Sequence, residues 1–264
     1  MGRPKLAIKN ATKIYGTKSS GTGILALDQI NLEVEAGAFV SLVGPSGCGK
    51  TTLLWSIAGL HALSAGTIEL DGTPISGPRP QIGMMFQEAN LLPWRTVEKN
   101  IEFPFEVRRE KPAREKIKAL LDRVGLGGLE SRMPRELSGG MQQRASIVRA
   151  LSPDPDVLLM DEPFGALDAF TRDEMNLLME EIWMETRKTI VLITHSIAEA
   201  AFLSNTIHVM SARPGRIAKT FVVPFERPRA LELTGTKAFF DLVNEIKSEI
   251  QHQPGGRVAS TAAE

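Results

Sequence analysis

The sequence is poor in cysteine, in tyrosine and in long apolar runs. It contains one cysteine and one tyrosine among 264 residues, so no disulfide can form within the chain and a reducing compartment is expected. The longest apolar runs have the length of a strand, far below the ~20 residues that a membrane-spanning helix needs. Met1–Asn10 has no apolar segment, so no signal peptide is expected.

The sequence also lacks an excess of charge of either sign. Lys and Arg number 31, as do Asp and Glu, which gives a formal net charge of zero at pH 7. This balance argues against the basic surface typical of nucleic-acid-binding proteins, and no nucleic-acid partner is expected. The apolar fraction of 42% is ordinary for a folded chain, and the length allows one large domain or a core with a subdomain.

A phosphate-binding loop is the strongest local signal. Gly44–Thr51 fits the pattern G-x-x-x-x-G-K-[ST], between an apolar run that predicts a buried strand, Phe39–Val43, and a helical pattern, Leu53–Leu60. Glycines let successive backbone N–H groups face one anion, and the helix N-terminus adds its dipole. Lys50 is expected at the β- and γ-phosphates, and Thr51 at Mg²⁺. The predicted nucleotide-binding residues are Gly44, Pro45, Ser46, Gly47, Cys48, Gly49, Lys50, Thr51 and Thr52.

The alternation of apolar strands with amphipathic helices predicts an α/β fold with a mostly parallel sheet. Antiparallel strands are expected over Leu6–Ile14 and Leu25–Val34. Between about residues 88 and 152 the pattern becomes helical, with Pro93 and Pro104 as expected helix breakers. A final helix is predicted from one apolar face, and residues 253–264 are expected to be a disordered tail. That face comprises Phe239, Leu242, Val243, Ile246 and Ile250.

Two adjacent carboxylates, Asp161 and Glu162, follow the apolar strand predicted at Val157–Met160. Burying charge is costly, so carboxylates at the end of a buried strand need a partner. Asp161 is expected to hold Mg²⁺ through water, and Glu162 to accept a proton from an attacking water as general base. Taken alone, the pair is equally consistent with a helix cap or a solvated turn; the phosphate loop favours the functional interpretation.

Leu137–Gln142 reads L-S-G-G-M-Q and resembles the signature peptide of the ATP-binding-cassette (ABC) family. Met141 departs from the frequent glutamine of that family. The order of phosphate loop, signature peptide and paired carboxylates extends the resemblance over about residues 5–225. It implies a RecA-like P-loop NTPase core with an antiparallel β flank, a helical insertion subdomain at about 88–152, and a C-terminal helical extension at 226–252. Ser138 as a plain helix cap is the alternative, but it leaves the two glycines unexplained.

The resemblance implies a homodimer that encloses ATP. Ser138, Gly139 and Gly140 of one copy are then expected to cover the γ-phosphate bound by the other copy. Asp168 resembles a residue on the loop that crosses the dimer interface, and Tyr15 one that stacks on adenine. Stacking does not distinguish ATP from GTP.

The resemblance also assigns catalytic roles. Gln87 is expected to sense Mg²⁺ and the attacking water, so that Thr51, Gln87 and Asp161 form the predicted metal site. His195 follows a predicted strand and resembles the histidine that contacts the γ-phosphate and holds Glu162. The predicted catalytic residues are therefore Glu162, His195 and Gln87; an ordinary polar strand end is the structural alternative for Gln87.

Two peptides, Leu92–Val97 and Ser211–Ile217, are similar to the importer subfamily for nitrate, sulfonate and taurine. This similarity implies the ATPase subunit of an importer for a small anionic solute, with ATP and Mg²⁺ as cofactors. Its implied partners are integral membrane permease subunits and, indirectly, a periplasmic solute-binding protein, at the cytoplasmic face of the inner membrane. The loop Leu91–Arg95 fits two interpretations equally, core of the insertion or part of a groove for a permease helix.

Three alternatives stay open at this point. The chain could energise import of another small solute. It could be a non-transport ABC ATPase that acts in DNA repair or on ribosomes, although such chains usually carry tandem cassettes or coiled coils. A small phosphate-loop kinase is disfavoured by Ser138–Gln142 and His195.

Overall fold

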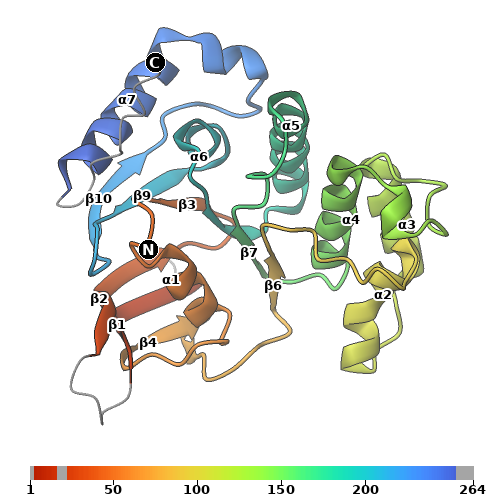
Figure 1. The fold of residues 1–264 in the computed structure, drawn as a ribbon, viewed down its shortest axis with the longest axis horizontal. Helices are drawn as coiled ribbons and strands as arrows, with labels where there is room; N and C mark the ends of the chain where they lie inside the picture. Colours follow the sequence, from red (N-terminus) through yellow and green to blue (C-terminus); the bar gives the residue numbers. More distant parts are fainter. Residues whose placement is uncertain (1–2, 17–22, 254–264) are drawn as a thin grey trace, which may run out of the picture.

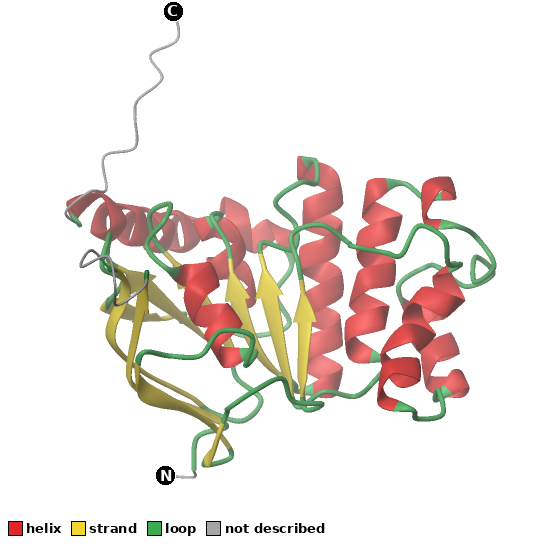
Figure 2. Cartoon of the chain, turned by 60° about the horizontal axis from the view of Figure 1, so that its bottom comes forward, coloured by secondary structure: helices red, strands yellow, loops and turns green. Residues whose placement is uncertain are grey.

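The computed structural model describes residues 3–16 and 23–253, so the predicted tail lies, apart from Gln253, outside the described residues. Its centre is a six-stranded sheet in the order β10-β9-β3-β8-β7-β6, in which β10 alone runs antiparallel to its neighbour. Figure 2 shows neighbouring strands of this sheet pointing the same way. The strands are β3 (Phe39–Val43), β6 (Ile82–Met85), β7 (Val157–Asp161), β8 (Thr189–Ile193), β9 (Thr206–Met210) and β10 (Ile217–Val222).

A second sheet of four antiparallel strands, in the order β2-β1-β4-β5, flanks the main sheet (Figure 1). Asp71 and Gly72 turn the chain between its last two strands, both with positive φ. The predicted α/β fold with a mostly parallel sheet and an antiparallel flank is therefore confirmed. The strands are β1 (Leu6–Tyr15), β2 (Ile24–Val34), β4 (Ala65–Leu70) and β5 (Thr73–Pro74).

Helices cover both faces of the main sheet. The helix α1 and the antiparallel sheet pack on one face, and α5, α6 and α7 pack on the other, while α2, α3 and α4 gather beside β6 (Figure 1). The α-helices are α1 (Lys50–Ile57), α2 (Val97–Arg108), α3 (Arg114–Arg123), α4 (Gly139–Leu151), α5 (Ala169–Thr186), α6 (Ile197–Leu203) and α7 (Lys237–His252). Two 3-10 helices, η1 (Pro134–Glu136) and η2 (Leu231–Gly235), complete the described elements.

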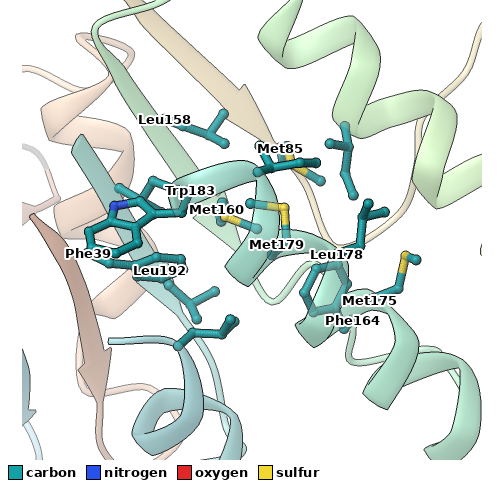
Figure 3. Packing of buried hydrophobic residues seen from close by; sticks show 14 of the residues in the cluster. Phe39, Met85, Leu158, Met160, Phe164, Met175, Leu178, Met179, Trp183 and Leu192 are labelled. Carbon is teal, nitrogen blue, oxygen red and sulfur yellow. The ribbon is translucent and has the colours of Figure 1, made fainter. Parts of the chain in front are cut away.

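Successive side chains of each parallel strand point to opposite faces of the sheet, which divides the core into two layers. On β7, Leu158 and Met160 face the cluster built on α5, whereas Val157 and Leu159 face the cluster built on α1. A parallel strand covered on both faces is apolar throughout. On the α5 side, the Trp183 indole packs edge-on against Phe39 (Figure 3), with ring centroids 6.3 Å apart.

The prediction that Pro104 breaks the helical pattern is wrong. Pro104 lies inside α2, which continues to Arg108. A proline in a helix interior removes one hydrogen bond and costs about 3 kcal/mol. The buried side chains Ile101 and Phe105 offset this cost, because each fully buried apolar side chain contributes about 1.5–3 kcal/mol. Tertiary packing therefore outweighs the local signal.

Candidate functional site

Five connections leave the same edge of the main sheet, because β3, β6, β7, β8 and β9 are parallel and their carboxyl ends coincide. Ligand sites of open α/β sheets lie at this edge. The phosphate loop follows β3, and Glu162 and His195 follow the adjacent strands β7 and β8. The topology thereby places residues distant in sequence around one position.

The loop Gly44–Thr51 packs so closely that glycine is required at some of its positions. Gly49 has a φ of +96°, and a Cβ there would lie 2.9 Å from the carbonyl oxygen of Ala26. Gly44 likewise lies so near β9 that a Cβ would be 2.7 Å from the Met210 carbonyl. No side chain caps the N-terminus of α1. Its first backbone N–H groups are therefore not occupied by a capping side chain, and an anion can accept from them.

Lys50 directs its charge along the loop. Only 5% of the residue is exposed, and its Nζ donates to the carbonyls of Gly44 at 2.9 Å and Pro45 at 3.2 Å. Cys48 is buried beneath it, and burial raises the pKa of the thiol. A buried thiol with a raised pKa is a poor nucleophile. Cys48 therefore serves as a small packing residue of the loop and not as a reactive thiol.

Glu162 and His195 form a pair at the mouth of the site, with His195 Nε2 2.7 Å from Glu162 Oε1. The backbone of Glu162 has a φ of +49°, in the left-handed region, and its N–H donates to the Ile193 carbonyl at 2.8 Å. Strained φ values outside glycine recur at functional sites. The bond to β8 holds Glu162 in this conformation and turns its carboxylate toward His195.

Asp161 occupies a more enclosed position. Burial, followed by the neighbouring Glu162 charge, raises the pKa of its carboxyl, against the hydrogen bond from Thr51. Thr51 Oγ1 donates to Asp161 Oδ1 at 3.3 Å. A hydroxyl and a carboxylate are hard oxygen ligands that suit Mg²⁺. The described residues contain no group of three His, Cys, Asp or Glu that could hold a metal.

The segment that carries His195 is fixed by residues that the sequence analysis missed. The Thr194 hydroxyl bonds to the carboxyl of Glu199 and accepts the Ser196 N–H at 2.9 Å. Ser196 Oγ in turn caps α6 by accepting the Glu199 N–H at 3.2 Å. Only 4% of Glu199 is exposed, and burial raises its pKa to about 7. The spacing S-x-x-E at Ser196–Glu199 matches a capping box and was the available signal.

A cavity of about 360 Å³ opens over the phosphate loop. It unites the loop with Glu162 and His195, and it also includes an apolar wall from β2 and one arginine from the β9–β10 connection. The apolar wall was not predicted, and Arg213 appeared in the sequence analysis only within the peptide Ser211–Ile217, without a role at the nucleotide. The lining residues are Ile24, Leu25, Ala26, Ser46, Gly47, Gly49, Lys50, Thr51, Thr52, Glu162, His195 and Arg213.

The predicted residues Tyr15 and Gln87 are not part of the wall of this cavity, and neither are Gly44, Pro45, Cys48 and Asp161. The Tyr15 hydroxyl is 2.9 Å from His61 Nδ1 and 3.4 Å from Thr52 Oγ1, so the ring stands at the start of α1. Gln87 is exposed and lines a neighbouring cavity of about 400 Å³ together with Pro163.

The signature residues form a separate group. Ser138 caps α4 by accepting the Met141 N–H at 3.3 Å, and Asp168 caps α5 by accepting the Thr171 N–H at 3.1 Å. Hydrogen bonds from Thr171 lower the pKa of Asp168. Ser138, Gly139, Gly140 and Asp168 line a cavity of about 430 Å³ that shares no residue with the phosphate-loop cavity. One copy therefore does not bring its signature residues to its own phosphate loop.

The chain is similar to known proteins over most of its length. A family model described as ABC transporter matches residues 27–165. An uncharacterised ABC transporter ATP-binding protein of Methanocaldococcus jannaschii is 47% identical over 85% of this chain and 84% of its own length. The aliphatic sulfonates import ATP-binding protein SsuB of Bacillus licheniformis is 46% identical over 85% and 87%. The taurine import ATP-binding protein TauB of Jannaschia sp. is 45% identical over 83% and 82%.

Solved structures agree with the fold. The dimeric structure of a bacterial ABC transporter cassette superimposes with a TM-score of 0.72 at 31% identity, covering 84% of this chain and 100% of that one. A second structure of that cassette, in a post-hydrolysis state bound to ADP and phosphate, matches to the same extent. Of the helices that the structure describes, none is both long and apolar enough to cross a bilayer.

Proposed function

The chain belongs to the ABC transporter family, and we propose that it is the ATP-hydrolysing subunit of an importer for small anionic solutes of the sulfonate and taurine type. Membership in the family makes it an ATP-binding ATPase. The observation that carries the catalytic part is the Glu162–His195 pair, 2.7 Å apart, in the wall of the phosphate-loop cavity. The solute class rests on the names of the SsuB and TauB relatives.

Hydrolysis follows from the chemistry of these side chains. Glu162 accepts a proton from a water molecule while the water oxygen bonds to the γ-phosphorus and the bond to the β–γ bridging oxygen breaks. His195 keeps the Glu162 carboxylate in one orientation. Lys50 and the N–H groups of the loop balance the negative charge on the phosphates. The products are ADP and inorganic phosphate.

Thr51 and Asp161 are the residues that would hold Mg²⁺, with Gln87 as the further ligand. When bound, the ion would supply positive charge that offsets the negative charge of the phosphates. The contact between Thr51 Oγ1 and Asp161 Oδ1 supports this assignment. For Gln87 the support is its position after β6, at the same sheet edge.

We further propose that two copies bind head to tail, with Ser138, Gly139 and Gly140 of one copy against the nucleotide on the phosphate loop of the other, and Asp168 at their interface. Separate cavities for the two groups within one copy support this arrangement. The dimeric form of the 31% identical cassette supports it as well. Tyr15, at the end of β1 and with its hydroxyl 3.4 Å from Thr52 Oγ1 of α1, is proposed to face the adenine ring.

The proposed partners are integral membrane permease subunits, fed by a periplasmic solute-binding protein, so that the chain works as a peripheral subunit at the cytoplasmic face. Trp94 supports a docking role, because 69% of it is exposed, whereas Leu91 packs against the core. In the proposed organisation residues 5–225 form the nucleotide-binding domain, with a helical insertion at about 88–152, and residues 226–252 form a C-terminal extension.

Complementation of a deletion strain tests the proposal. Cells without this chain should fail to grow with taurine or an alkanesulfonate as sole sulfur source and should grow normally on sulfate. The wild-type chain should restore growth, and so should Glu232→Gln, which changes an exposed glutamate outside the cavity. Glu162→Gln should not restore growth, since loss of a general base slows hydrolysis about 10²–10⁴-fold. Growth restored by Glu162→Gln would contradict the catalytic role, and undiminished growth of the deletion strain would contradict the solute class.

A further inference from the structure

Arg213 lies in the wall of the phosphate-loop cavity although it belongs to the connection between β9 and β10. Its Nε donates to the carbonyl oxygen of Gly47 at 3.2 Å. A Cβ added to Gly47 would lie 2.8 Å from Arg213 Nη2. The guanidinium is therefore packed against the backbone of the loop, at its middle.

The connection that carries Arg213, residues 211–216, contacts both β2 and the phosphate loop, which line the cavity. The Gly215 N–H donates to the Ala26 carbonyl at 3.0 Å, and the Asp28 N–H donates to the Gly215 carbonyl at 3.0 Å. A Cβ added to Gly215 would lie 2.1 Å from the Cys48 carbonyl, so the connection touches the phosphate loop directly. These backbone contacts fix the position from which the arginine side chain extends.

Arg213 has no carboxylate partner in the part of the chain that the structure describes. Over residues 3–16 and 23–253, no carboxylate lies within ion-pairing distance of Arg213, whereas the nearby Arg216 pairs with Asp28. Within the same residues, only Nε of Arg213 has a protein acceptor. The terminal nitrogens of a guanidinium form a planar fork that fits two phosphate oxygens. The Arg213 guanidinium, whose terminal N–H groups are available as donors, therefore lies beside the phosphate-binding loop.

We propose that Arg213 is a nucleotide-binding residue, whose guanidinium donates hydrogen bonds to the phosphate oxygens of the nucleoside polyphosphate on the loop Gly44–Thr51. The inference rests on the proposed function and adds a specific contact to it. The arginine supplies a second positive charge beside Lys50, from a part of the chain far beyond the phosphate-loop motif. Since the contact is to phosphate, it strengthens binding of ADP and ATP and leaves binding of the bare nucleoside unchanged.

Titration calorimetry with ADP, which the enzyme does not consume, tests the proposal. Arg213→Gln should raise the Kd for ADP about tenfold, the effect of losing a hydrogen-bonded charge. Arg213→Lys should give an intermediate loss, because it keeps the charge and removes the fork. The matched control is Lys219→Gln, which removes the same charge from an exposed position on β10 and should change the Kd by less than about twofold. Adenosine should bind all four proteins equally.

Several results would overturn the proposal. An unchanged Kd for ADP in Arg213→Gln, with an unchanged melting temperature, would mean that the arginine only braces Gly47. An equal loss for adenosine and ADP would place the guanidinium on the base instead. If Arg213→Gln does not fold, wild-type affinity in Arg213→Lys would refute the bidentate contact. If the wild-type chain itself bound no ADP, the proposed function would be wrong. If the wild-type chain bound ADP and substitution of Arg213 did not change the Kd, only the inference about Arg213 would be wrong.

Discussion

Asp161 and Glu162 are neighbours in the chain that face different environments. Asp161 lies partly buried beside Thr51 with a raised pKa, whereas Glu162 turns out of the strand in a left-handed conformation toward His195. Carboxylates in different surroundings can take different roles. At the scale of single residues, we therefore propose that a change in backbone conformation separates a metal-facing carboxylate, Asp161, from a water-facing one, Glu162.

Glu199 is expected to make the chain less stable as pH rises. Its pKa is raised from 4.5 to about 7 by burial, so between these values the folded chain keeps a proton that the unfolded chain has released. Unfolding then releases a proton, and the free energy of unfolding falls with increasing pH, by up to about 3 kcal/mol over this window. Glu199→Gln cannot titrate. Its stability relative to the wild type should therefore increase from pH 5 to pH 8 in urea unfolding.

The control for this experiment is Glu232→Gln, an exposed glutamate whose substitution should leave the pH dependence unchanged. A stability difference between Glu199→Gln and the wild type that is the same at pH 5 and pH 8 would show that Glu199 is ionised in the folded chain.

At the scale of elements, local signals predicted most helices and strands, and tertiary contacts decided the exceptions. The helices α4 and α6 each begin at a serine cap that is visible in the sequence. Pro104 was misread, since burial of Ile101 and Phe105 is not a local property. The phosphate loop was predictable from its motif, whereas Arg213 reaches the cavity only through pairing of Gly215 with β2.

A matched helix cap allows the proposed role of Ser138 in dimerisation to be distinguished from its contribution to stability as a cap of α4. Ser138→Ala should destabilise the fold by about 1 kcal/mol, as loss of a cap does, and should also weaken ATP-dependent dimerisation more than ATP binding by the monomer. Thr236→Ala is the matched control: Thr236 caps α7 by accepting the Phe239 N–H at 3.3 Å, outside the three cavities discussed above. It should lose similar stability and dimerise normally. Equal loss of dimer in both variants would assign Ser138 a capping role only.

At the scale of the molecule, we propose one surface for nucleotide and a separate one, which includes Trp94, for a permease. Trp94 precedes α2, in the group of helices beside β6. Trp94→Ala should leave the ATPase rate of the isolated chain unchanged and should reduce co-purification with membrane subunits, because exposed aromatic residues commonly anchor interfaces.

Phe240→Ala provides the comparison for Trp94→Ala. Phe240 is a similarly exposed aromatic residue, 64% accessible, on α7. It should assemble with the membrane subunits as the wild type does. Undiminished assembly of Trp94→Ala would remove Trp94 from the proposed docking surface, and equal loss in both variants would indicate a general effect of surface hydrophobicity.

Because the phosphate loop and the signature residues lie in separate cavities of one copy, the central claim is that two copies bind head to tail around ATP. The molar mass of Glu162→Gln, measured by light scattering during size-exclusion chromatography with and without ATP and Mg²⁺, tests it most directly. The account predicts a monomer of about the sequence mass, 28.8 kDa, that doubles in mass when ATP is added and does not do so in Glu162→Gln combined with Ser138→Ala. A mass that stays monomeric with saturating ATP, or a dimer indifferent to Ser138, would contradict it.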